Sequence, residues 1–168
     1  MMRDQFGEAA QRVLDACRAR RLMIATAESC TGGLVAGALT EIAGSSDVVE
    51  RGFVTYSNAA KETMLGVPQP TIATYGAVSK QTAEAMAQGA IANSSADISV
   101  AITGIAGPSG GTPEKPVGLV HFAAASRAGQ LLHREERFGD IGRAQVRAQS
   151  VLVALAMLEE LTLLQAPA

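Results

Sequence analysis

The chain contains no tryptophan, and aromatic residues make up only 4% of its 168 positions. Alanine and glycine are abundant instead, which favours close packing of helices on a sheet through small side chains. The chain has only two cysteines and two histidines. Neither Cys17 and Cys30 nor His121 and His133 have the spacing of metal ligands or of a redox pair. We therefore expect no metal and no cofactor.

A basic cluster interleaved with aromatic residues is also missing, and the formal net charge is -2. The sequence thus lacks the electrostatic footprint of a nucleic-acid-binding protein. No apolar run approaches the roughly 18 residues of a membrane span. Residues 1–5 are not followed by the apolar core of a signal peptide. These absences predict a cytoplasmic protein that binds neither nucleic acid nor membranes.

Apolar segments alternate between helical and strand spacing along the chain. The pattern predicts helices at about 6–21, 31–42, 59–65, 80–92 and after Asp140, and strands at 22–27, 48–56, 98–105, 117–125 and 131–138. Asn58, Ser79 and Asp140 are the expected N-caps of three of these helices. No repeat, linker or change of composition divides residues 1–168. We expect a single three-layer α/β/α domain with a mixed β-sheet, whose strand order stays open.

Residues 26–33, Thr-Ala-Glu-Ser-Cys-Thr-Gly-Gly, connect an expected buried strand to an expected helix. The first N–H groups of a helix have no partner inside the helix, so they can hold a phosphate or stabilise an oxyanion. Ser29 at this turn is therefore a candidate nucleophile. The alternative is a helix cap, which is the common role of serine before a helix. A cap explains neither the neighbouring Glu28 nor the small residues at 31–33.

Lys61 lies in the first turn of the helix expected at 59–65. The helix dipole disfavours positive charge there, and burial acts in the same direction. Together they can lower a lysine pKa from about 10.4 toward 7–8, where the amine is a usable general base. The alternative is a solvated surface lysine. Tyr56, between a strand end and this helix, can orient the amine or donate to an oxyanion, or simply pack half-buried.

Residues 103–111, Thr-Gly-Ile-Ala-Gly-Pro-Ser-Gly-Gly, form a glycine-rich loop after an expected buried strand. Glycines let a backbone approach a ligand closely. The spacing matches neither the P-loop nor the dinucleotide fingerprint, and a plain surface turn is the alternative. Arg143 and Arg147 lie four positions apart and share one helix face, where they can clamp a phosphate or remain solvated.

Taken together, these segments resemble the CinA C-terminal domain family. The similar stretches are 26–33, 42–46 (Ile-Ala-Gly-Ser-Ser), 51–58 (Arg-Gly-Phe-Val-Thr-Tyr-Ser-Asn), Lys61, 76–79 (Gly-Ala-Val-Ser), 103–108 and 115–118 (Lys-Pro-Val-Gly). They extend over nearly the whole chain. The family often has a compact Gly-Asp-Arg before the last helix, whereas residues 139–143 are Gly-Asp-Ile-Gly-Arg. Whether Arg143 takes the place of the usual arginine therefore stays open.

The resemblance implies an amidohydrolase of pyridine nucleotide salvage, which converts nicotinamide mononucleotide (NMN) to nicotinic acid mononucleotide and ammonia without a metal. It places a serine–lysine dyad on Ser29 and Lys61, acting through an acyl-enzyme. Backbone N–H groups from Cys30 to Gly32, with Tyr56, are then expected to bind the oxyanion. The other expected substrate-binding residues are Thr31, Gly33, Thr103, Gly104, Gly107 and Arg143. The group that holds the phosphate stays open among Thr31, the loop at 104–111 and Arg143.

Two other functions stay open at this point. The same dyad can serve the hydrolysis of another nucleotide-like amide. Alternatively, the protein is a non-enzymatic binding partner in competence or DNA-damage responses, a role that requires neither a serine–lysine pair nor a lowered pKa. The apolar helices are compatible with a homodimer or a higher homo-oligomer.

Overall fold

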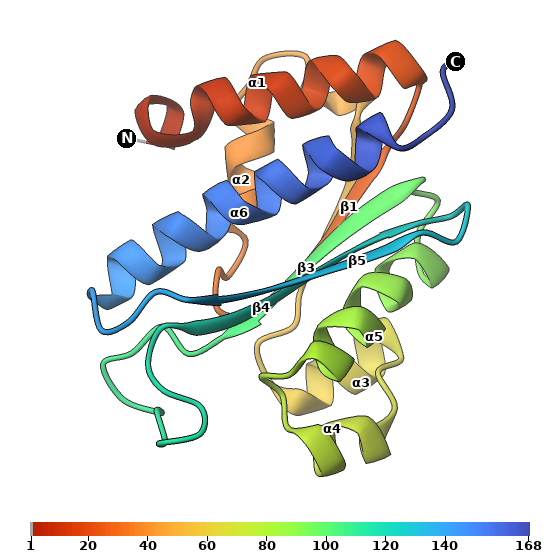
Figure 1. The fold of residues 1–168 in the computed structure, drawn as a ribbon. Helices are drawn as coiled ribbons and strands as arrows, with labels where there is room; N and C mark the ends of the chain where they lie inside the picture. Colours follow the sequence, from red (N-terminus) through yellow and green to blue (C-terminus); the bar gives the residue numbers. More distant parts are fainter. Residues whose placement is uncertain (1) are drawn as a thin grey trace.

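A mixed five-stranded sheet forms the middle layer of the computed structural model, which describes residues 2–168 (Figure 1). Its strands are β1 (Ile24–Glu28), β2 (Val49–Val54), β3 (Ile98–Gly104), β4 (Leu119–Ser126) and β5 (Leu131–Arg137). The order across the sheet is β2-β1-β3-β4-β5. Strand β1 runs parallel to β2 and β3, and β4 runs antiparallel to β3 and β5. The prediction of a three-layer α/β/α fold with a mixed sheet is confirmed.

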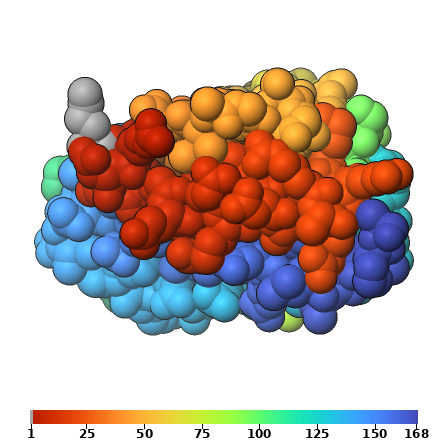
Figure 2. Space-filling view, turned by 90° about the horizontal axis from the view of Figure 1, so that it is seen from above, coloured from red at the N-terminus to blue at the C-terminus, as the bar shows by residue number. Residues whose placement is uncertain are grey.

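Helices α1 (Met2–Arg20), α2 (Leu34–Thr40) and α6 (Arg143–Leu163) cover one face of the sheet. Helices α3 (Asn58–Leu65) and α5 (Lys80–Ala92) cover the other, with α4 (Gln69–Tyr75) packed on α5. A short 3-10 turn, η1 (Ser45–Asp47), precedes β2. In Figure 2, α1 lies across the visible face of the molecule, between α2 and α6. No helix among residues 2–168 is long and apolar enough to cross a membrane.

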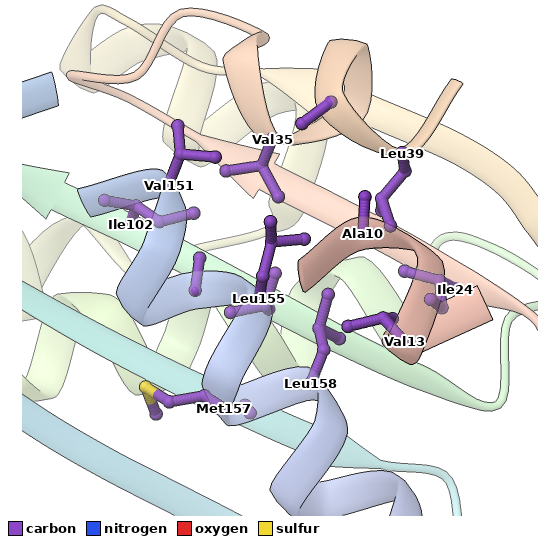
Figure 3. Packing of buried hydrophobic residues seen from close by; sticks show 14 of the residues in the cluster. Ala10, Val13, Ile24, Val35, Leu39, Ile102, Val151, Leu155, Met157 and Leu158 are labelled. Carbon is purple, nitrogen blue, oxygen red and sulfur yellow. The ribbon is translucent and has the colours of Figure 1, made fainter. Parts of the chain in front are cut away.

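The two faces of the sheet have different cores. Branched side chains fill the space under α1, α2 and α6, where Val13, Val35 and Leu155 meet the sheet (Figure 3). Alanines dominate the opposite face, against α5. There an added Cβ at Gly89 would overlap the carbonyl group of Leu65, so only glycine allows α3 and α5 to approach so closely. The predicted close packing through small side chains thus occurs on the α3/α5 face.

Several helix boundaries differ from the sequence prediction. The N-cap of α3 is Ser57, not Asn58, because the Ser57 hydroxyl accepts the N–H of Ala60 at 3.0 Å. Ser79 caps α5 as predicted. The N-cap of α6 is Gly142 rather than Asp140. Helix α2 begins at Leu34 instead of residue 31, because the two glycines before it have positive φ. Helix α4 was not predicted, since none of its residues is buried and no apolar stripe marks it.

The three parallel strands end at the same edge of the sheet. Glu28, the last residue of β1, pairs with Val54 at the end of β2 and with Ile102 near the end of β3. The chain continues from β1 into α2 on one face, and from β2 into α3 on the other. Such an arrangement leaves a crevice outside the carboxyl ends of the strands, where α/β proteins bind ligands.

Candidate active site

Ser29 and Lys61 lie in hydrogen-bonding contact at this edge. Ser29 directly follows β1, and its backbone N–H donates to Ile102 O at 2.9 Å, which extends the β1–β3 ladder by one residue. Lys61 lies in the first turn and a half of α3 and points back toward β1. The Lys61 Nζ and Ser29 Oγ atoms are 2.9 Å apart. A nucleophile and a base within hydrogen-bond reach form the basic unit of nucleophilic catalysis.

Two backbone carbonyls hold the Lys61 amine in place. Its Nζ atom donates to Thr55 O at 2.8 Å and to Tyr56 O at 3.2 Å. The side chain is only 1% exposed, and no carboxylate among residues 2–168 forms an ion pair with it. Burial lowers the pKa of Lys61 to about 8, against a weak opposing effect of Cys30. The direction of this shift agrees with the sequence prediction, with burial as its main cause.

Cys30 is adjacent to Ser29 but is poorly suited to be a nucleophile. Its thiol is buried, and burial raises the pKa of Cys30 to about 12. The reactive thiolate form is therefore rare at neutral pH. Its backbone is more relevant: within residues 2–168, the N–H groups of Cys30 and Thr31 donate to no other residue, whereas the N–H of Gly32 donates to Ser29 O at 3.0 Å. Of the three expected backbone donors to the oxyanion, two therefore have no partner in another described residue.

A cavity of about 220 Å³ opens directly onto the Ser29–Lys61 pair. Its lining residues are Ser29, Cys30, Tyr56, Lys61, Ala77, Val78, Thr103, Gly104, Ala106 and Arg143. Of the residues predicted to bind substrate, Thr31, Gly32, Gly33 and Gly107 are not part of this lining. A larger hollow of about 610 Å³ lies among α3, α4 and α5, but its lining contains neither serine nor lysine. The smaller cavity, which contains the serine–lysine pair, is therefore the candidate active site.

Arg143 and Tyr56 meet at the rim of this cavity. Arg143 Nη2 donates to the Tyr56 hydroxyl at 3.1 Å, and Nη1 donates to Gly107 O at 2.9 Å. Both side chains are exposed, and that of Tyr56 retains 62% of its accessible surface. The sequence left Arg147 open as a phosphate clamp with Arg143 or as a solvated side chain, and in the structure it donates to Cys30 O at 3.1 Å and Thr31 O at 3.3 Å. Arg147 therefore supports the turn after Ser29, and Arg143 alone of this pair lines the cavity.

The cavity wall at Ala77 and Val78 was not predicted as part of the site. Hydrogen bonds to three consecutive carbonyl groups fix it. Lys115 Nζ donates to Tyr75 O at 2.6 Å, Thr82 Oγ1 to Gly76 O at 2.7 Å and Thr103 Oγ1 to Ala77 O at 2.8 Å. Thr103, predicted to bind substrate, thus uses its hydroxyl to hold this wall. The Gly-Ala-Val-Ser stretch at 76–79 was the only sequence signal for it.

Glu28 occupies the N-terminus of α2. Its buried carboxylate accepts the N–H of Val35 at 2.9 Å and the N–H of Ala36 at 3.1 Å. The first turn of this helix, expected from the sequence to hold an anion of the substrate, thus already has an anion of the protein itself. The unoccupied amides near Ser29 belong to the turn before α2.

The two histidines lie outside the cavity. His121 Nδ1 and His133 Nε2 are 3.0 Å apart on the neighbouring strands β4 and β5. Within residues 2–168, no group of three or more histidine, cysteine or acidic side chains is arranged to hold a metal ion.

The fold and the site define a class of α/β protein with a buried serine–lysine pair at the carboxyl ends of its parallel strands. Comparison with known proteins identifies the family: the CinA C-terminal domain matches residues 7–162, so the chain belongs to the CinA family.

Proteins of known name and structure resemble nearly the whole chain. It is 49% identical over 159 residues to the nicotinamide-nucleotide amidohydrolase PncC of Escherichia coli K12, covering 94% of this chain and 95% of that protein. Identity to the PncC of Enterobacter agglomerans is 50% over 141 residues, covering 83% and 85%. The crystal structure of competence/damage inducible protein CihA from Agrobacterium tumefaciens superposes with a TM-score of 0.92 at 58% identity, covering 94% and 95%.

Proposed function

We propose that this protein hydrolyses the carboxamide of nicotinamide mononucleotide to give nicotinic acid mononucleotide and ammonia. Two lines of argument support the proposal. Relatives that are about half identical over most of the chain bear the name nicotinamide-nucleotide amidohydrolase. Within the site, the observation that carries the chemistry is the 2.9 Å contact between Ser29 Oγ and the buried amine of Lys61.

The surroundings of Lys61 suit the neutral amine. A neutral lysine has two N–H donors and one lone pair, whereas the ammonium form has three donors. The carbonyls of Thr55 and Tyr56 accept the two N–H groups. The lone pair then faces the hydroxyl of Ser29. In this state Ser29 donates its proton to Lys61, which is the direction required of a general base.

Acylation follows from this geometry. Lys61 takes the proton of Ser29 while Oγ forms a bond to the carboxamide carbon, and the carbonyl oxygen becomes an oxyanion. The N–H of Cys30, a residue that lines the cavity and whose N–H donates to no other residue, is the donor we assign to it. The C–N bond then breaks as the Lys61 ammonium returns its proton to the leaving nitrogen. Ammonia departs and the acyl group stays on Ser29.

Deacylation repeats the same proton movements with water. Lys61, neutral again, takes a proton from water as the water oxygen attacks the ester carbon. The bond from this carbon to Ser29 Oγ then breaks, and Lys61 protonates the departing Oγ. The product is released as the carboxylic acid, which gives its proton to water and becomes the carboxylate, and Ser29 and Lys61 return to their starting protonation states. One amine thus serves as base and acid in both halves of the reaction.

Arg143 is the group we assign to the substrate phosphate. Of the other candidates for this role, Thr31 is fully buried and does not line the cavity. The loop at 104–111 contributes only Gly104 and Ala106 to the lining, and neither side chain carries a charge. Arg143 is exposed at the rim, next to Tyr56, where a phosphate can reach it while the pyridine ring enters the cavity. A guanidinium is well matched to a phosphate because it donates two parallel hydrogen bonds.

A panel of amides tests the proposal. Ammonia release is measured with nicotinamide mononucleotide, nicotinamide riboside, nicotinamide and an unrelated carboxamide such as asparagine. We expect the mononucleotide to have the highest kcat/KM, and the riboside to be slower because it lacks the phosphate. A higher kcat/KM with another nucleotide-like amide would replace the substrate but keep the reaction. Failure of folded protein to hydrolyse any amide would contradict the proposal and favour a non-enzymatic role.

A further inference from the structure

Glu28 is next to the dyad in the fold but does not face the cavity. It is the last residue of β1 and directly precedes Ser29. Its side chain is fully buried and does not contribute to the cavity lining. A carboxylate is costly to bury, so a fully buried one needs partners that compensate for its lost hydration. The hydrogen-bond partners of Glu28 therefore indicate its structural role.

The side chain of Glu28 closes the turn that presents Ser29. Its two oxygens accept the N–H groups of Val35 and Ala36, seven and eight positions further along the chain. The intervening turn contains Gly32 with φ +59° and Gly33 with φ +105°. Glycines allow many backbone conformations, so such a turn needs an external constraint to hold one of them. The carboxylate supplies this constraint from the strand side.

Helix α2 gives that constraint a fixed anchor. Val35 and Leu39 point into the core shared with α6, where Val151 and Leu155 lie close by (Figure 3). All four side chains are fully buried. The amides that bind Glu28 therefore belong to a helix held in place by packing. Glu28 thus ties the Ser29 turn to the rigid part of the fold.

The backbone of Glu28 is connected to Lys61, the base, through Thr55. Its carbonyl accepts the N–H of Thr55 at 2.8 Å, and the carbonyl of Thr55 accepts Lys61 Nζ at 2.8 Å. Besides the direct contact of the two side chains, a path through the backbone of Glu28 and Thr55 therefore connects Ser29 to Lys61. A displacement of Glu28 would move the nucleophile and the base relative to each other.

We propose that Glu28 is a positioning residue that sets the distance and orientation between Ser29 and Lys61. It does not touch the substrate, and it acts through the turn after Ser29 and through Thr55. This inference rests on the proposed function, because it concerns the dyad that this function uses. Misplacement of reacting groups by about 1 Å can cost roughly 100-fold in rate, so such a role has a measurable effect.

The test is Glu28→Gln, which preserves the shape of the side chain. The amide oxygen can replace one carboxylate oxygen, but the NH2 group then faces a backbone N–H and cannot accept from it. We expect kcat to fall about 10- to 100-fold, with little change in KM, because Glu28 lies away from the substrate. The pH midpoint of the rate should stay near 8, because burial is the main cause that lowers the pKa of Lys61.

Asp97→Asn is the matched control. Asp97 Oδ2 accepts the N–H of Met23 at 2.8 Å, just before the other end of β1. The substitution therefore removes a carboxylate that binds the chain just before β1, at the opposite end of that strand from the dyad. We expect it to lower the melting temperature without changing kcat. An equal loss of kcat in both variants would overturn the proposal, since the loss would then follow general destabilisation.

A second readout keeps this inference separate from the choice of substrate. A fluorophosphonate probe labels an activated serine: the Oγ–P bond forms, the P–F bond breaks, fluoride leaves and the serine proton passes to Lys61. We expect Glu28→Gln to slow labelling of Ser29 by about the same factor as kcat. If the wild type labels rapidly but hydrolyses no nicotinamide mononucleotide, the proposed function fails while the labelling comparison still tests Glu28. Wild-type labelling by folded Glu28→Gln would overturn the positioning role.

Should Glu28→Gln fail to fold, Glu28→Asp is measured instead. It retains the carboxylate but is one methylene shorter, so it cannot reach both amides without moving the turn. A folded Glu28→Asp with reduced kcat and reduced labelling supports the proposal. A folded Glu28→Asp with wild-type values of both contradicts it.

Discussion

The amine of Lys61 reaches the hydroxyl of Ser29 from a different element of the fold, at 2.9 Å and across 32 positions of the chain. Ser29 is fixed by the end of β1, whereas Lys61 is fixed by α3. The carbonyls of Thr55 and Tyr56, in the short connection between β2 and α3, accept two of the amine's hydrogen bonds. The contact therefore depends on tertiary structure, and it gives a buried lysine a defined chemical partner.

Lys61→Arg should abolish nearly all turnover. A guanidinium stays charged at any accessible pH and cannot accept the proton of Ser29. Loss of a general base typically costs about 10²- to 10⁴-fold, which is the expected fall in kcat. The measurement is ammonia release, with circular dichroism to confirm folding. Lys80→Arg, at an exposed lysine that pairs with Glu84, is the control and should retain full activity.

The rate should depend on pH through the amine of Lys61. Only the neutral amine accepts a proton, and its pKa is about 8. Below that value kcat should rise about tenfold per pH unit, and above it kcat should level off. Initial rates in overlapping buffers across this range provide the measurement. A rate that stays constant from well below pH 8 to well above it would exclude Lys61 as the base.

The same pKa predicts how stability depends on pH. The pKa of Lys61 falls from 10.5 to about 8 on folding, so the unfolded chain binds more protons than the folded protein between these two values. The stability of the wild type should therefore rise with pH across that window, by up to roughly 3 kcal/mol. Lys61→Met lacks this titration. Denaturant unfolding of both proteins below pH 8 and near pH 10.5 should show their difference shifting in favour of the wild type.

Arg143→Ala should impair recognition of the phosphate. Loss of a charged hydrogen bond costs about 1.5–3 kcal/mol, so kcat/KM for nicotinamide mononucleotide should fall roughly 10- to 100-fold. The effect should disappear with nicotinamide riboside, which lacks the phosphate. Arg134→Ala removes an arginine of β5 that pairs with Glu160 and serves as the control. An equal loss on both substrates would assign Arg143 a role other than phosphate binding.

The layers of the fold were predictable because apolar periodicity is a local signal. Runs such as Ile98–Gly104 are buried along nearly their whole length and appear in the sequence as mainly apolar segments. Helix α4 has no buried residue and therefore no such signal. Ser57 and Asn58 are both good capping residues, and their order of preference depends on backbone geometry that the sequence does not specify.

The site was predictable only in part, for a related reason. The turn at Ser29 and the helix position of Lys61 are local features, and the resemblance to the CinA family connects them. The role of Glu28 depends on amides of α2 whose position is set by the core, and the wall at Ala77 depends on Thr103 from another strand. Such long-range hydrogen bonds leave no spacing pattern in the sequence. They become visible only when the fold brings the elements together.

Ammonia release from nicotinamide mononucleotide by the wild type and by Ser29→Ala, side by side, tests the central claim most directly. Removing a hydroxyl that lies at the cavity should leave the fold intact, which circular dichroism can verify. We predict release by the wild type and a loss of several orders of magnitude in Ser29→Ala, because the attacking oxygen is gone. Near-native release by Ser29→Ala would contradict the account and place the nucleophile at another residue.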